Sequence, residues 1–174
     1  MGKQKGEKVR YSASTVIDFP QGTGRFVLVQ ETAPHKKGKL NLAGGTKDPG
    51  DRTLIDTAKR EAKEETGGIH STIPDHGFDV VITGLIGVYA HEQHTSRLCV
   101  VFSAVAISGI MWASTEHPIV DAYTIEEVDE FHDMGRLRDE RVHHAIHAYY
   151  KGIVLPIGEL STQILDSEVL TFDK

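Results

Sequence analysis

One helical segment of this chain places three glutamates on one side and then ends at a pair of glycines. It reads KREAKEETGGI and runs from Lys59 to Ile69. Because a helix turns by about 100° per residue, Glu61, Glu64 and Glu65 stand at i, i+3 and i+4 and face the same way. Like charges at this spacing destabilise an exposed helix by roughly 0.2–0.5 kcal/mol per pair. The segment therefore predicts a helix whose acidic side needs a positive partner.

Two partners could offset this negative charge. Arg60 precedes Glu64 by four residues and can pair with it, but one arginine cannot neutralise three carboxylates. A divalent ion could, and clustered carboxylates are the hard oxygen ligands that favour Mg²⁺ or Mn²⁺ over zinc. The alternative is a charged, solvated helix face, and the spacing alone does not decide between the two.

The segment before this helix, LNLAGGTKDPGD, favours the metal. Gly44 and Gly45 supply backbone that can approach a ligand closely. Carbonyl groups in that position can add an oxygen ligand to a metal, and N–H groups there can bind phosphate oxygens. We therefore expect a loop at Gly44 and Gly45 that faces the acidic helix.

The rest of the pattern predicts strands, a helix, more strands and then two further helices. Gly67 and Gly68 should end the first helix, since glycine readily adopts the left-handed conformation of a helix stop. This order favours an α/β (α+β) fold with a mixed sheet between helices. The expected strands are Val9–Phe19, Arg25–Glu31, Leu40–Ala43, Phe78–Ala90, Arg97–Ile107 and Ile119–Tyr123, and the expected helices are Thr53–Thr66, Ile125–His132 and Leu137–Lys151.

A longer pattern is built around the glutamates. Gly45 is followed by five residues, Asp51, eight residues and then REAKEETGG from Arg60 to Gly68. This resembles the signature of the Nudix hydrolases, which is Gly, five residues, Glu, seven residues and then Arg-Glu-apolar-x-Glu-Glu-x-Gly-apolar. The departures are Asp51 in place of glutamate, one extra residue after it, and Gly68 in the apolar position, with Ile69 following. The resemblance covers residues 40–68 directly.

The resemblance implies an α/β/α sandwich with a mixed β-sheet. It also implies metal-dependent hydrolysis of a pyrophosphate bond in a nucleoside diphosphate linked to another moiety, or in a related small pyrophosphate. The cofactor would be Mg²⁺ or Mn²⁺. Arg60 and Asp51 would support the site, and Glu64 would be a metal ligand or a water-activating base. The full set of metal ligands implied by the family is Glu61, Glu64, Glu65 and the carbonyl of Gly44.

Members of the family also recruit an acid from a later loop. Glu116 is the first candidate for this role and Glu92 the second, with an exposed loop acid as an equal alternative for each. Other residues could contact the substrate, although ordinary strand or surface roles remain open for them. These are Arg25, Lys39 and Arg97 for phosphates, Tyr89 and Tyr123 for stacking on a base, and the backbone of Gly44 and Gly45.

A second class of function remains open, because Asp51 and the longer spacing after it alter the signature. In that interpretation the chain is a non-catalytic nucleotide-binding or regulatory module on the same fold. The net charge of −6 argues against nucleic acid as a partner. We expect a small-molecule substrate, with a homodimer as an open possibility.

The remaining composition predicts a cytoplasmic protein. The chain has 174 residues, which suits one domain over residues 1–174 with a flexible segment at 1–8. No signal peptide and no apolar stretch long enough to span a bilayer are visible. The single cysteine, Cys99, excludes an internal disulfide and lies in an apolar run that predicts a buried strand position.

The ten histidines raise the question of zinc. His143 and His147 stand at i and i+4 on one predicted helix, and His91 and His94 share a loop. The spacing places no third ligand, and neither an HExxH pattern nor a cysteine pair is present. Ordinary histidines on polar faces are therefore the preferred interpretation.

Overall fold

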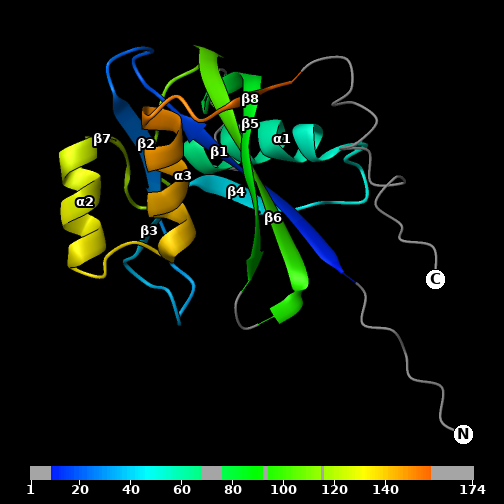
Figure 1. The fold of residues 1–174 in the computed structure, drawn as a ribbon, viewed down its shortest axis with the longest axis horizontal. Helices are drawn as coiled ribbons and strands as arrows, with labels where there is room; N and C mark the ends of the chain where they lie inside the picture. The colour runs from blue at the N-terminus through cyan, green and yellow to red at the C-terminus, as the bar shows by residue number, and fades with distance from the viewer. Residues whose placement is uncertain (1–8, 68–75, 92–93, 115, 158–174) are drawn as a thin grey trace, which may run out of the picture.

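The computed structural model describes residues 9–67, 76–91, 94–114 and 116–157, with helices on both faces of the larger, mixed β-sheet (Figure 1). The prediction of a flexible segment at residues 1–8 lies outside the described residues.

The predicted helices and strands are present, and their ends lie within three residues of the predicted ones. The exception is the expected strand Leu40–Ala43, which is two strands, β3 and β4. The helices are α1 (Leu54–Gly67), α2 (Ile125–Asp133) and α3 (Glu140–Tyr150). The strands are β1 (Arg10–Ile17), β2 (Arg25–Gln30), β3 (Leu40–Asn41), β4 (Ala43–Thr46), β5 (Asp79–His91), β6 (His94–Ser108), β7 (Val120–Thr124) and β8 (Leu155–Pro156).

The strands form two sheets. The larger has the order β4-β1-β6-β5-β8, and the smaller has the order β3-β2-β7. Strands β1 and β6 run parallel, whereas β1–β4, β5–β6 and β5–β8 are antiparallel, so the larger sheet is mixed. Strand β8 lies in a part of the chain for which the sequence made no prediction.

The helices cover opposite faces of the larger sheet, as Figure 1 shows with α1 on one side and the α2–α3 pair on the other. Successive side chains of a strand point to opposite faces, and β6 shows this directly. Its Val100 packs with Leu54 of α1, and its Val101 packs in the cluster that contains Ile146 of α3. This arrangement is the predicted α/β/α sandwich.

Gly44 and Gly45 form part of strand β4, so the prediction of a loop at this position is wrong. Gly44 pairs with Ser14 of β1, and a Cβ at Gly44 would overlap the Ser14 hydroxyl and the backbone of Ala13. Glycine weakens a strand, but it is required where two backbones approach this closely. The local pattern showed the two glycines but could not show the strand that packs against them.

The first helix ends at Gly67, as predicted, but the reason is different for this residue. Gly67 has no positive φ angle, whereas a Cβ there would collide with the backbone of His76 and Gly77. Close packing of the chain that follows therefore requires this glycine. Gly68 lies outside the described residues.

Candidate active site

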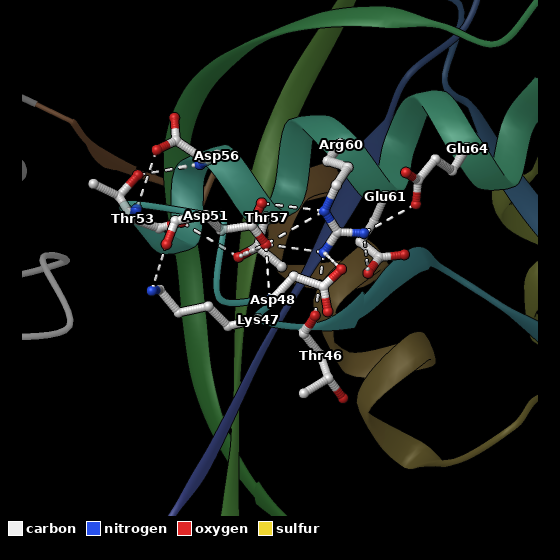
Figure 2. A network of polar contacts seen from close by, with 10 residues as sticks. All are labelled: Thr46, Lys47, Asp48, Asp51, Thr53, Asp56, Thr57, Arg60, Glu61 and Glu64. Atoms are coloured by element: carbon white, nitrogen blue, oxygen red, sulfur yellow. Dashed lines mark hydrogen bonds and ion pairs between the residues drawn. The ribbon is translucent and has the colours of Figure 1, made fainter. Parts of the chain in front are cut away.

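Arg60 joins helix α1 to the loop that precedes it (Figure 2). Its Nη2 lies 2.9 Å from Oδ2 of Asp51 and its Nε 3.1 Å from Oδ1, which makes a two-point contact. On the other edge, Nη1 lies 2.9 Å from Glu64 and 2.9 Å from Glu61. The pairing of Arg60 with Glu64 that the spacing predicted is confirmed. One guanidinium thus holds a loop acid and two of the three glutamates.

Asp51 is buried at the start of this network, with 7% of its side chain exposed. Its Oδ2 accepts hydrogen bonds from the backbone N–H of Asp48 and the hydroxyl of Thr57, each at 3.0 Å. The hydrogen bond from Arg60, opposed by burial, lowers the pKa of the Asp51 carboxyl to about 2. Asp51 therefore reaches Arg60 despite its shorter side chain and the longer spacing that follows it.

Glu61 lies against Gly45 of β4. Its side chain is 12% exposed, and a Cβ at Gly45 would overlap its carboxylate. Burial raises the pKa of the Glu61 carboxyl to about 7; Arg60 opposes this shift, and the carboxylates of Glu65 and Glu64 add to it. The protein alone therefore does not fully compensate a negative charge at this position.

Glu65 contacts a different set of groups. Its Oε2 accepts a hydrogen bond of 2.7 Å from the backbone N–H of Gly44. Its Oε1 lies 3.4 Å from Nε2 of His117, whose Nδ1 lies 3.0 Å from the carbonyl of Gln30. Burial lowers the pKa of the His117 imidazole, but Glu65 and the Gln30 carbonyl outweigh it, so the net shift is upward.

His117 was missed by the sequence analysis, although its neighbour Glu116 was selected. Glu116 is exposed, and its carboxylate contributes to raising the pKa of His117. The buried histidine, with 7% of its side chain exposed, contacts Glu65 directly. The sequence could have indicated His117, because it follows the predicted acid Glu116 in the loop just before strand β7. The catalytic role of Glu116 stays a prediction, and Glu92 lies outside the described residues.

A family model for the NUDIX domain matches residues 10–146. The chain belongs to this family. The resemblance carried by the glutamate helix is thereby confirmed, and with it the expectation of a Nudix hydrolase. No curated protein sequence matches the chain.

Several solved structures share the fold. A NUDIX hydrolase from Nitrosomonas europaea has a TM-score of 0.69 and 22% identity, covering 86% of this chain and 94% of its own. A UDP-X diphosphatase has a TM-score of 0.60 and 16% identity, covering 86% of this chain and 66% of its own. An ADP-ribose pyrophosphatase from Streptococcus suis 89-1591 has a TM-score of 0.55 and 18% identity, covering 80% and 91%. At these identities the similarity establishes the fold alone.

In this NUDIX domain, Gly44 and Gly45 separate the glutamates from a pocket of about 730 Å³. Lys39, one of the predicted phosphate contacts, lines that pocket together with both glycines. Arg97 and Tyr89 line it as well. The structure therefore brings these five predicted residues to one hollow beside the acidic helix.

Arg25 and Tyr123 are placed elsewhere. The Arg25 guanidinium donates a hydrogen bond of 2.6 Å to the carbonyl of Ala122 and lies 3.9 Å from Glu127. Tyr123 packs edge-to-face on Phe131, with 5.0 Å between ring centroids. Neither residue lines the pocket, so the structure does not bring them to the predicted site.

The pocket carries an excess of positive charge. Asp139 and Glu140 are its acids. Arg138 is 2.6 Å from Glu31 and Arg141 is 3.3 Å from Asp139, while the other four basic residues form no ion pair with a described residue. The basic lining residues are Arg10, Lys36, Lys39, Arg97, Arg138 and Arg141.

Cys99 is buried in strand β6 as predicted, with 8% of the residue exposed. The structure adds a contact that the sequence did not indicate, because Nη1 of Arg141 donates to its Sγ at 2.7 Å. Nη2 of Arg141 also donates to the side-chain oxygen of Asn41 at 3.3 Å. These contacts hold the Arg141 guanidinium at the wall of the pocket.

The residues present fit a hard divalent cation. Glu61, Glu64 and Glu65 offer oxygen donors on one face of α1. Among the described residues, Arg60 is the cation that contacts Glu61 and Glu64, and the His117 imidazole contacts Glu65. Carboxylate oxygens are the donors that Mg²⁺ and Mn²⁺ prefer. The Gly44 carbonyl as a metal ligand stays a prediction. The N–H of Gly44 donates a hydrogen bond to Glu65.

Proposed function

We propose that this NUDIX domain uses Mg²⁺ or Mn²⁺ to hydrolyse a pyrophosphate bond in a nucleoside diphosphate linked to another moiety, or in a related small pyrophosphate. The observation that carries the proposal is the junction at Gly44 and Gly45. On one side of these glycines lie Glu61 and Glu65, and on the other lies a pocket rich in lysine and arginine. A cationic pocket beside a carboxylate cluster suits a substrate that is anionic and reacts at a metal.

In this proposal Glu61, Glu64, Glu65 and the carbonyl of Gly44 hold the metal. When bound, the metal would polarise phosphoryl oxygens and lower the pKa of a bound water. The raised pKa of the Glu61 carboxyl supports a cation at this position, since the protein alone leaves its charge poorly compensated.

The other residues have positioning roles. Asp51 fixes Arg60 through two contacts, and Arg60 in turn orients Glu61 and Glu64. Glu64 is the most exposed of the three glutamates, at 35% of its side chain, compared with 12% for Glu61 and 17% for Glu65. It is therefore the best placed to meet solvent, as a ligand or as the base that accepts a proton from the attacking water.

The pocket supports the substrate class. Four lysine and arginine side chains without described ion partners are available to phosphate oxygens. Lys36 is one of them, and burial followed by the charge of Arg138 lowers the pKa of its ammonium group. The UDP-X diphosphatase and the ADP-ribose pyrophosphatase are named for diphosphates linked to another group, which is the same chemical class.

The alternative, a non-catalytic module, arose from the altered spacing after Asp51. Because Asp51 nevertheless contacts Arg60 at 2.9 Å, the feature that motivated this alternative leaves the network intact. No other observation on the described residues favours it.

The experiment is a product panel. The protein is incubated with Mg²⁺ and a series of nucleoside diphosphate sugars, dinucleotides, nucleoside triphosphates and small non-nucleotide pyrophosphates, and the products are separated by anion-exchange chromatography. The proposal predicts cleavage at the P–O–P bridge in at least one of them, and none when Mg²⁺ is replaced by a chelator. Binding of a panel member without product would support the non-catalytic module instead.

Two further expectations accompany the proposal. The partner is a small molecule, and nucleic acid is not expected because the net charge is −6. No helix among the described residues is long and apolar enough to cross a membrane. A cytoplasmic location and a homodimer are proposals that fractionation and light scattering can test.

A further inference from the structure

A second group of metal-ligating side chains converges between helices α2 and α3. Nε2 of His143 lies 2.8 Å from Oδ1 of Asp129, and Nε2 of His147 lies 2.6 Å from the same oxygen. The ligand atoms of the three residues all lie within 4.8 Å of one another. None of the three contacts the Arg60 network, so this is a separate feature of the molecule.

The fold brings the third ligand that the spacing could not supply. His143 and His147 are one turn apart on α3 and share a face. Helix α2 lies beside α3 (Figure 1) and presents Asp129 to that face. The start of α2 is fixed by a capping box between Thr124 and Glu127, and its Val128 is fully buried. The position of Asp129 is therefore set by the packing of its own helix.

The donor set differs in kind from the glutamate cluster. Two imidazole nitrogens with one carboxylate oxygen form the ligand set of many zinc sites, which leave a fourth position for water. Imidazole suits Zn²⁺, Ni²⁺ and Cu²⁺, whereas Mg²⁺ prefers oxygen alone. The side chains of His143, His147 and Asp129 are 20%, 24% and 49% exposed. An ion can thus reach them from solvent and keep a water.

An outer contact holds His143 in place. The ring of His132 stacks on it, with centroids 4.1 Å apart and the planes 20° apart, and Nε2 of His132 lies 2.8 Å from Glu140. The near-parallel stack and the bond to Glu140 assign His132 to support and not to coordination. A ring stacked at this distance restricts the rotation of the His143 imidazole.

We propose that Asp129, His143 and His147 form a second metal site that takes a first-row transition ion such as Zn²⁺ and ties helix α2 to helix α3. Glu140, Arg141 and His144 near the start of helix α3 line the pocket, so an ion at this site also stabilises one wall of that pocket. The proposal does not depend on the proposed hydrolytic activity.

The test is Zn²⁺ titration of untagged, chelator-treated protein, with millimolar Mg²⁺ present to occupy the carboxylate site. We expect one Zn²⁺ per chain by calorimetry. At a concentration about 100 times Kd, Zn²⁺ should raise Tm by roughly 5–10 °C, because the ion binds only the folded state. Absence of both effects would overturn the proposal.

Substitutions test whether the Zn²⁺ is bound by Asp129, His143 and His147. His143→Gln with His147→Gln should abolish the Zn²⁺-dependent rise in Tm, and Asp129→Asn, which keeps the size of the side chain, should weaken Zn²⁺ binding at least about 10-fold. His144→Gln is the matched control on the same helix and should bind as the wild type does. The pair Glu61→Gln with Glu65→Gln should also retain the effect. Equal Zn²⁺ affinity in wild type, the double histidine variant and Asp129→Asn would show adventitious binding and contradict the proposal. If the double histidine variant fails to fold, the comparison of wild type with Asp129→Asn alone decides between the two outcomes.

Discussion

Asp51 is the residue at which the altered signature is accommodated. It is shorter than glutamate, yet it makes a two-point contact with Arg60 and accepts two more hydrogen bonds from Asp48 and Thr57. The extra residue between Asp51 and Arg60 lengthens the connection into α1, and the carboxylate remains buried at the end of it. Sequence spacing could not show this, because it depends on where the loop folds back.

Replacement of Asp51 by asparagine should therefore destabilise the protein. It leaves Arg60 without its buried partner, and a loss of about 3 kcal/mol in the free energy of unfolding is expected. Asp48→Asn is the matched control, since its carboxylate is 65% exposed and lies 3.8 Å from Arg60. Its cost should be below about 1 kcal/mol. Urea denaturation of both variants measures the difference, and equal stabilities would contradict the role of Asp51.

The difference in stability between the wild type and Asp51→Asn should depend on pH. Because the pKa of Asp51 is lowered to about 2 from an ordinary 3.8, its carboxylate stabilises the fold above about pH 4. This contribution is lost as the pH falls through about 2. The gap in stability between wild type and Asp51→Asn should thus narrow from about pH 4 to about pH 2. A stability difference that stays constant over this pH range would show that ionisation of Asp51 is not its cause.

Lys39 and Arg25 were both expected to bind substrate, and the structure separates them. Lys39→Gln removes a charge from the pocket lining and should raise KM about 10-fold, with a smaller change in kcat. Lys37→Gln alters an exposed neighbour outside the lining and should leave KM unchanged. Steady-state kinetics on the best panel substrate measures both, and a KM that moves with neither variant would remove Lys39 from the site.

At the scale of elements, the site depends on how strand β4 meets helix α1. Gly45 faces the carboxylate of Glu61 so closely that a Cβ would overlap it, whereas Gly44 faces backbone of β1. A flexible side chain can move away from a new methyl group, but a strand backbone cannot. The two adjacent glycines therefore differ in what surrounds them: Gly45 leaves room for the Glu61 carboxylate, and Gly44 allows β4 to pack against β1.

Gly45→Ala should consequently displace Glu61 and lower Mg²⁺ affinity by roughly 10-fold while the protein still folds. Gly50→Ala is the control, because a Cβ there meets nothing within 4 Å and its φ angle is not positive. Isothermal titration with Mg²⁺, together with circular dichroism, separates binding from folding. Unchanged Mg²⁺ affinity in Gly45→Ala would show that Glu61 does not hold the ion.

In helix α1, the Glu61 carboxylate that would bind the metal should lower the stability of the metal-free protein. Since the pKa of the Glu61 carboxyl is raised to about 7 from 4.5, metal-free protein should lose stability as the pH rises through that window. Glu61→Gln should lose less over the same range and gain less from added Mg²⁺. Denaturant midpoints with chelator and with Mg²⁺ check both parts, and identical pH profiles for the two proteins would contradict the argument.

Local patterns predicted the elements better than the contacts between them. The order of the expected strands and helices was sufficient for the fold class, and the glutamate spacing was sufficient for the acidic face. In contrast, His117 reaches Glu65 from a loop more than 50 residues away, and Asp129 meets His143 from another helix. Strand β4 was missed because glycine disfavours strands unless a close neighbour requires it. Such contacts arise only from the tertiary fold.

At the scale of the whole molecule, α1 on one face of the larger sheet and α3 on the other meet the same central strands β1 and β6. The pocket opens where β1, β4 and β6 meet the start of α3, and the glutamates approach it from α1. The carboxylates come from α1, whereas the basic side chains come from β1, from β6, from α3 and from the segments that precede β3 and α3.

The central claim is that the glutamates of α1 act in metal-dependent hydrolysis, and one measurement tests it most directly. Initial rates are determined at saturating Mg²⁺ with the best panel substrate for wild type, Glu64→Gln and Glu130→Gln, the last being an exposed acid of α2. We expect a fall in kcat of at least about 100-fold for Glu64→Gln and wild-type rates for Glu130→Gln, with circular dichroism unchanged in both. Wild-type turnover by a folded Glu64→Gln would contradict it.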